Sequence, residues 1–179
     1  MRAVRRSTLL LLAALSGLTS CGIPTTGVVQ AGGPASGLAP TVRVYFVTNG
    51  TLIAVRRRFT SAVGVEEAVQ LLLQGPTLPE RFKGVTTRLP HPAPVAATNG
   101  ATAEAAPSDL VKVISHRNSV TIELTALMGS PDDLGARQII CTAVDAQRLA
   151  APGTEPLPVT VTGPDHRRVE GTGKQCAVG

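Results

Sequence analysis

Residues 42–56 read VRVYFVTNGTLIAVR and carry the strongest local folding signal in the sequence. Asn49-Gly50 stands between two runs rich in β-branched residues, and Asn-Gly is the preferred two-residue hairpin turn because both positions need a positive φ. A turn centred there gives one apolar face with these cross-strand pairs: Phe46 with Ile53 and Val44 with Val55. The opposite face then carries Arg43, Tyr45, Ala54 and Arg56. The pattern predicts a hairpin whose apolar face is covered and whose other face is wetter.

Two helices are predicted further along the chain. Residues 65–73 have apolar side chains at helical spacing, acids in the first turn and Gly75-Pro76 as a stop signal. Its apolar stripe consists of Val65, Ala68, Val69, Leu72 and Leu73. The second helix begins at residues 130–133, SPDD, where we expect Ser130 to be the N-cap and Pro131 the first helical residue. Its buried face consists of Ala136, Ile139, Ile140, Ala143 and Val144.

The remaining strands complete an α+β fold. Residues 110–114 and 119–124 alternate apolar with polar side chains and form a second hairpin, and residues 157–161 form a third strand region. The predicted order is ββ-α-ββ-α-β(β), with two helices packed on one face of a small mixed sheet. The predicted domain spans residues 41–170, with a low-complexity surface loop at 90–109 and a C-terminal tail at 171–179.

The N-terminus has the pattern of an export signal. Arg2, Arg5 and Arg6 precede an uncharged, leucine-rich stretch at residues 7–17, which is too short to span a hydrocarbon core of about 30 Å. The sequence Leu-Thr-Ser-Cys-Gly at 18–22 resembles the lipobox of bacterial lipoproteins. The resemblance implies that residues 1–20 are a signal peptide, removed before Cys21, and that Cys21 is lipidated.

Lipidation of Cys21 predicts a protein attached to the cell membrane on its extracytoplasmic face. Two acyl chains anchor stably where one chain is marginal. Residues 21–40 follow as a lipid-anchored flexible tether rich in Gly, Pro, Ala and Thr. A coil of this length reaches roughly 20–25 Å, enough to hold the domain above the headgroups.

The net charge argues against a nucleic-acid partner. The full chain has 17 basic and 12 acidic residues, a balance of +5. Removal of the three signal-peptide arginines lowers that balance to 14 minus 12, or +2. With only one Tyr and three Phe, the chain also offers little surface for base stacking.

Cys141 and Cys176 are the even pair that remains once Cys21 is set aside. In an oxidising compartment such a pair favours a disulfide. Closing the loop between the two cysteines would raise the free energy of unfolding by roughly 4 kcal/mol in the chain-entropy model. The alternative is two separate thiols. A metal site is disfavoured because neither cysteine has a histidine at ligand spacing.

No motif predicts catalysis, a metal or a cofactor. His91, His116 and His166 lie in turns or in the low-complexity loop, without a second ligand at useful spacing. Adjacent acids at 132–133 suit the first turn of a helix better than a catalytic pair, and no G-x-S-x-G elbow is present. We therefore expect a protein that is not an enzyme.

The sharpest charge run is Arg56, Arg57 and Arg58, at the end of the first hairpin. Strand alternation divides these three side chains between the two faces of the strand. A solvated strand end is the simpler interpretation. The functional alternative is a surface contact with anionic lipid or a wall polymer.

Four segments taken together resemble the GerMN domain, named for the spore germination protein GerM. They are residues 42–55, then 68–77 (AVQLLLQGPT), 84–90 (GVTTRLP) and 120–125 (VTIELT). The resemblance covers roughly residues 41–168, and LLQGPT at 72–77 is its most specific part. The tether sequence CGIPTTG is similar to that of actinobacterial lipoproteins with a single GerMN domain.

The resemblance implies a non-catalytic module of envelope, sporulation or signalling assemblies, with a fold similar to ring-building motifs. In one such lipoprotein family the domain accompanies the extracellular part of a sensor kinase. The expected partners are therefore an envelope protein, such as a sensor kinase ectodomain, or a second copy of the chain. The alternative expectation is a binding lipoprotein for a small solute or a wall polymer.

Overall fold

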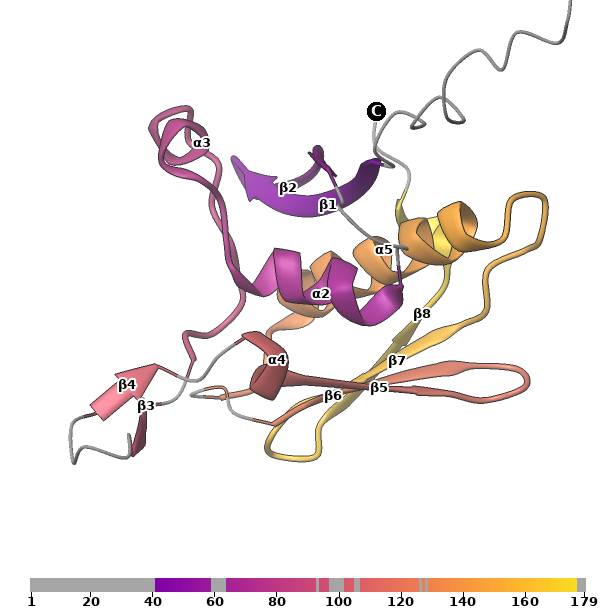
Figure 1. The fold of residues 1–179 in the computed structure, drawn as a ribbon. Helices are drawn as coiled ribbons and strands as arrows, with labels where there is room; N and C mark the ends of the chain where they lie inside the picture. Colours follow the sequence, from indigo (N-terminus) through magenta and orange to yellow (C-terminus); the bar gives the residue numbers. More distant parts are fainter. Residues whose placement is uncertain are drawn as a thin grey trace, which may run out of the picture. The chain divides into compact units, whose positions relative to one another are not determined.

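The computed structural model describes residues 41–58, 64–92, 94–96, 102–104, 107–125, 127 and 129–176. These residues all belong to the compact unit at 37–179. The predicted signal peptide, Cys21 and the tether lie outside the described residues. The domain is shown as a ribbon in Figure 1.

The N-terminal hairpin has the predicted register. Strands β1 (Thr41–Thr48) and β2 (Thr51–Arg58) are antiparallel, and Phe46 pairs with Ile53 and Val44 with Val55. Asn49 and Gly50 have φ angles of 49° and 75°, as the two-residue turn requires. The local sequence was therefore sufficient to predict this element.

Helix α2 (Val65–Leu73) also agrees with its prediction. Ala68, Val69 and Leu72 are buried, and the chain leaves the helix through Gly75, which has a φ of 79°. Only glycine adopts this left-handed conformation without strain, so Gly75 fixes the direction of the segment that follows.

Helix α5 (Asp133–Ala150) begins later than predicted, and Ser130 is not its cap. The N-cap is Asp132, whose Oδ1 accepts a hydrogen bond of 2.7 Å from the Gly135 N–H. A carboxylate accepts from the positive end of a helix more strongly than a hydroxyl does. The Ser130 hydroxyl instead donates to Asp165, in the turn between strands β7 and β8.

The last strands form a mixed sheet of four. It contains β5 (Val111–Ser115), β6 (Val120–Leu124), β7 (Val159–Thr162) and β8 (Arg168–Gly171), in that spatial order. The β6–β7 pair is parallel and the outer pairs are antiparallel. Helix α5 makes the crossover from β6 to β7, which a parallel pair needs.

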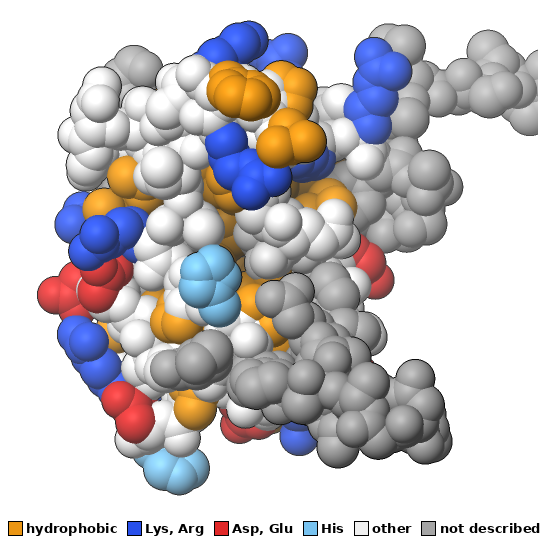
Figure 2. All heavy atoms as spheres, turned by 90° about the vertical axis from the view of Figure 1, so that its left-hand side faces the viewer, with side chains coloured by type: hydrophobic (Ala, Val, Ile, Leu, Met, Phe, Trp, Pro, Cys, Tyr) orange, Lys and Arg blue, Asp and Glu red, His pale blue; other side chains and the backbone are white. Residues whose placement is uncertain are grey.

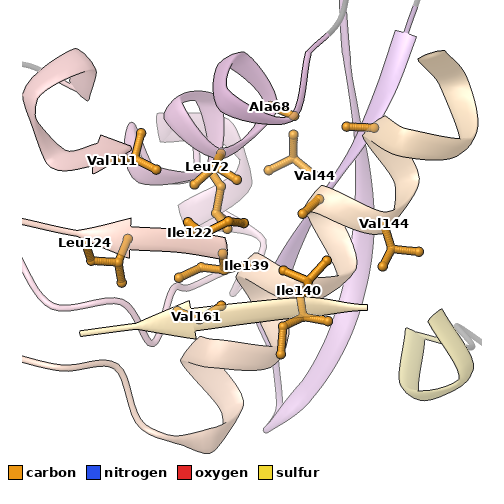
Figure 3. Packing of buried hydrophobic residues seen from close by; sticks show 14 of the residues in the cluster. Val44, Ala68, Leu72, Val111, Ile122, Leu124, Ile139, Ile140, Val144 and Val161 are labelled. Carbon is orange, nitrogen blue, oxygen red and sulfur yellow. The ribbon is translucent and has the colours of Figure 1, made fainter. Parts of the chain in front are cut away.

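The α+β class and the order ββ-α-ββ-α-ββ are confirmed, but the strands divide into two sheets. Helices α2 and α5 pack against both the β1–β2 hairpin and the four-stranded sheet, and Figure 1 shows them between the two. The core where they meet is seen in Figure 3. Its members include Val44, Leu72, Ile122, Ile139, Ile140 and Val161. Burial on both sides explains why the helices are apolar over so wide an arc.

Short elements occur where the sequence predicted only loop or tail. Strands β3 (Pro94–Ala96) and β4 (Thr102–Glu104) pair within the predicted loop, and helix α4 (Pro107–Leu110) ends at a buried leucine. A 3-10 helix, η1 (Gly173–Cys176), continues the fold after β8. Such elements are too short for apolar periodicity to predict them.

The prediction that the second face of the hairpin is exposed to solvent is wrong at Tyr45. Tyr45 is 2 % exposed and packs with Cys141 and Cys176. Its partners come from α5 and η1, elements remote in sequence that cover this part of the hairpin. The local pattern could not reveal that this face is covered.

The outer edge of β1 is capped by polar side chains of α5. The N–H of Arg43 donates to Asp145 Oδ2 at 3.0 Å, and the N–H of Tyr45 donates to Thr142 Oγ1 at 3.1 Å. The amide of Gln138 donates to the Tyr45 carbonyl at 2.9 Å. Positions 138, 142 and 145 lie on one face of α5, so the helix takes the place of a neighbouring strand.

Gln138 also accepts a 2.7 Å hydrogen bond from the Arg88 N–H. We expect Gln138→Leu to lower the free energy of unfolding by about 2–4 kcal/mol, because it leaves two backbone groups without partners. Urea unfolding measures this change. Gln70→Leu on α2 is the control and should change stability by less than about 0.5 kcal/mol. Equal effects of the two substitutions would contradict the capping role of Gln138.

Candidate functional site

An apolar groove of about 620 Å³ lies beside the C-terminal end of α2. Its walls are residues 72–76, 85–87 and 89–92, together with Arg81 and Leu110. Most of these residues belong to LLQGPT (72–77) and GVTTRLP (84–90), two of the four segments whose pattern stands out in the sequence. Two segments singled out in the sequence for their pattern therefore meet around one surface feature.

Helix α3 (Leu78–Phe82) follows the first of these segments and presents two large apolar side chains to solvent. Leu78 is 62 % exposed and Phe82 is 88 % exposed. They lie four positions apart, so they share one side of the helix. Figure 2 views this side of the domain, and hydrophobic side chains gather among Lys and Arg where α3 lies.

An ion pair fixes α3 to the hairpin. The Arg57 guanidinium donates to both oxygens of Glu80, each at 2.6 Å. Glu80 also accepts from the Thr77 N–H at 2.8 Å, which completes the capping box of α3. The helix that exposes Leu78 and Phe82 is thus attached to the hairpin through the Arg57–Glu80 ion pair.

The pKa of Glu80 is lowered to about 2, chiefly by the hydrogen bonds from Arg57. Burial acts in the opposite direction, and the hydrogen bonds from Thr77 add to the lowering. A carboxylate with this pKa stays ionised throughout the neutral and mildly acidic range.

The structure separates the three arginines of the predicted charge run. Arg57 is half-buried in its ion pair, and its guanidinium carbon lies 5.3 Å from the centroid of the Phe46 ring. Arg56 and Arg58 are exposed. The predicted division between strand faces is therefore confirmed, and it leaves Arg57 in a structural position.

Cys141 and Cys176 are brought together, with their sulfur atoms 2.08 Å apart, which is disulfide distance. They join η1 to the middle of α5, beside Tyr45. Burial raises the pKa of Tyr45, while the positive charges of Arg43 and Arg148 oppose that rise.

The histidines and the paired acids are dispersed. All three histidines are exposed, and His91 also lines the groove. Within the described ranges, no three His, Cys, Asp or Glu side chains lie together as a metal site would require. Asp132 binds Arg88 at 2.7 Å and Asp133 binds Arg167 at 2.5 Å. Burial tends to raise the pKa of Asp132, but hydrogen bonds from Gly135 and Arg88 together lower it.

The fold and these surfaces define a small α+β domain with an apolar groove next to an exposed apolar helix. None of the helices described in the structure is long and apolar enough to cross a membrane. Comparisons with protein-family models, with curated proteins and with solved structures find no match for this chain.

The Arg57–Glu80 pair predicts a pH-dependent contribution to stability. Because the folded-state pKa of Glu80 lies below its ordinary value of 4.5, the pair stabilises the fold above that pH. The contribution is lost as the pH falls towards 2. We expect Glu80→Gln to lower the free energy of unfolding by roughly 0.5–1 kcal/mol at pH 7 and to match the parent protein near pH 2.

Chemical denaturation across this pH range measures the difference. Glu66→Gln is the control, because Glu66 is an exposed acid of α2 for which the described residues provide no ion pair. A Glu80→Gln deficit that is independent of pH would contradict the role assigned to the ion pair.

Proposed function

We propose that this chain is a lipid-anchored, extracytoplasmic module of the GerMN type that binds another protein of the cell envelope or a second copy of itself. In this proposal it catalyses no reaction and needs no cofactor. The observation that carries the proposal is the exposure of Leu78 and Phe82, on a helix joined to the hairpin by an ion pair, beside an apolar groove. Large exposed apolar side chains with a fixed geometry are typical of surfaces that bind protein partners.

The GerMN assignment is supported by where its motif residues lie. Residues 72–76 form one wall of the groove and residues 85–90 contribute to another, except for Arg88. Residue Thr77 is the N-cap of α3. The LLQGPT motif at 72–77 thus contains the end of α2, part of the groove wall and the N-cap of the exposed helix α3. This arrangement suits a module that binds another protein.

The proposed location on the extracytoplasmic face of the cell membrane is supported by the lipobox at 18–22. A second support is the pairing of Cys141 with Cys176 at disulfide distance. We propose that these cysteines are oxidised in the exported protein, since disulfides persist in oxidising compartments. Cys21 then remains as the cysteine for lipidation.

A second candidate function is binding of a small solute or a wall polymer. The groove volume of about 620 Å³ favours it, because small-molecule sites commonly enclose about 300–1,000 Å³. A thermal-shift screen of solutes and wall fragments separates the two functions. Saturable stabilisation that is lost in Leu89→Asp, a groove variant, would support ligand binding.

The interaction surface is tested by Phe82→Ser. We expect this substitution to reduce capture of an envelope partner, or self-association, by at least tenfold, since a central aromatic side chain can contribute 2 kcal/mol or more, on the order of a hot spot. Chemical cross-linking in intact cells followed by mass spectrometry identifies both kinds of contact. Phe82→Leu keeps an apolar side chain and should retain most of the contact. Cross-linking that is the same in all three proteins would overturn the proposal.

The lipid anchor is tested by metabolic labelling with palmitate. We expect label in the parent protein and none in Cys21→Ala, because the sulfur of Cys21 is the proposed acceptor of the lipid. Cys176→Ala serves as the control and should keep the label. Absence of label from the parent protein would refute the anchor.

A further inference from the structure

A basic pocket lies beside the position where the chain enters the described domain. It has a volume of about 450 Å³ and is lined by Thr41, Arg43, Arg56, Asp145, Arg148 and Leu149. Three arginines and one aspartate give this lining a formal charge of 3 minus 1, or +2. The hairpin register predicted from the sequence already placed Arg43 and Arg56 on one face, and the fold adds Arg148 of α5.

Two of these arginines face each other across the hairpin. Arg43 and Arg56 are direct cross-strand partners in the β1–β2 register. Like charges in that position repel each other and destabilise a strand pair. Asp145 compensates the charge of Arg43, whereas no described carboxylate pairs with Arg56, so the pocket keeps an excess of positive charge.

Asp145 of α5 holds the Arg43 side chain in place. Its Nε donates to Asp145 Oδ1 at 2.8 Å, and its terminal nitrogen lies 2.6 Å from the same oxygen. The other carboxylate oxygen accepts the Arg43 N–H, and Asp145 is 7 % exposed. The carboxylate is therefore occupied by Arg43, which is itself half-exposed, and the described structure assigns Asp145 no bond to Arg56 or Arg148.

The Arg148 guanidinium lies close to Gly173 of η1. A Cβ added at Gly173 would lie 2.6 Å from a terminal nitrogen of Arg148 and 3.0 Å from Val144 Cγ1. The Arg148 guanidinium therefore lies against the Gly173 backbone, where glycine has no side chain to displace it. Cys176, at the end of the same short helix, lies at disulfide distance from Cys141 of α5. This pair connects η1 to the helix that carries Arg148.

Arg56 and Arg148 are both exposed. Among the described residues, neither one has a carboxylate within ion-pair distance. The pocket thus combines one arginine oriented by a buried acid with two that keep their hydrogen-bond donors for a ligand. Guanidinium groups in this arrangement match the oxygens of a phosphate.

We propose that this pocket binds the phosphodiester headgroup of an anionic membrane phospholipid. The choice of a lipid source rests on the proposed anchor at Cys21. Thr41 is in the pocket wall, and only residues 22–40 separate it from Cys21. Even fully extended, that stretch spans at most about 70 Å, so the proposed anchor limits Thr41 to that distance from the membrane surface.

The test titrates the full-length chain, in neutral detergent, with glycerophosphoglycerol, the deacylated headgroup of phosphatidylglycerol. Arginine side-chain NMR signals report binding. We expect saturable shifts, and about fivefold weaker affinity in Arg56→Gln and in Arg148→Gln, the value that corresponds to about 1 kcal/mol per arginine. Arg56→Lys should recover part of the affinity because it restores the charge.

Arg117→Gln is the matched control. Arg117 is an exposed arginine in the turn between β5 and β6, and it does not line the pocket. Equal weakening by Arg117→Gln, or no saturable shift in the parent chain, would overturn the proposal. A thermal unfolding midpoint equal to that of the parent protein verifies that each variant keeps the fold.

Two further arms identify the source of the phosphate. Inorganic phosphate should bind at least fivefold more weakly than the headgroup, and equal binding would overturn the assignment to a lipid. In nanodiscs that hold the lipidated chain, phosphatidylglycerol should shift the Arg148 signal and pure phosphatidylcholine should not. Absence of palmitate label from the parent protein would refute the anchor, but the titration in detergent would still report headgroup binding. Failure of the proposed anchor and failure of the proposed pocket are therefore distinguishable.

Discussion

The fold depends on one set of hydrogen bonds, those by which α5 caps the free edge of β1. A two-stranded hairpin is marginal in water by itself, and its outer strand presents unpaired N–H and C=O groups. Here Gln138, Thr142 and Asp145 satisfy that edge from a helix, and Val47 continues it by pairing with Thr86. Because the capping residues share a helix with Ile139 and Ile140, the same element covers the four-stranded sheet. The cap and the apolar core that β1 shares with α2, α5 and the four-stranded sheet together join the two sheets into one domain.

The two arginines with carboxylate partners on this hairpin connect the cap to the candidate surfaces. Arg43 is held by Asp145 of α5, and Arg57 is held by Glu80 of α3. The first ion pair orients one wall of the basic pocket, and the second fixes the helix that exposes Phe82. Both carboxylates have additional backbone partners, which makes each pair more than a surface contact. The hairpin is thus the shared support for two distinct surfaces.

The sequence predicted the elements whose signals are local. The Asn49-Gly50 turn set the hairpin register, and apolar spacing with a Gly75 stop set α2. It did not predict that Gln138 and Thr142 are buried, because a polar residue on a helix is ordinarily solvated and their shared partner, the backbone of Tyr45, is more than 90 residues away. For the same reason Arg148 could not be recognised as a neighbour of Arg43 and Arg56, which the predicted hairpin register had already placed on one face. The groove residues were found in advance only as a motif, without their geometry.

The positions of the two surfaces along α5 bear on how they work together. Gln138 and Asp132, near its start, hold the Arg88 segment that leads into the groove wall. Arg148, near its end, lines the basic pocket. Ten residues of helix place Gln138 and Arg148 about 15 Å apart along the axis. In the proposed arrangement, a pocket that holds a headgroup sets the C-terminal end of α5 towards the bilayer. The groove end then faces away from the lipid, where a partner protein has room to bind.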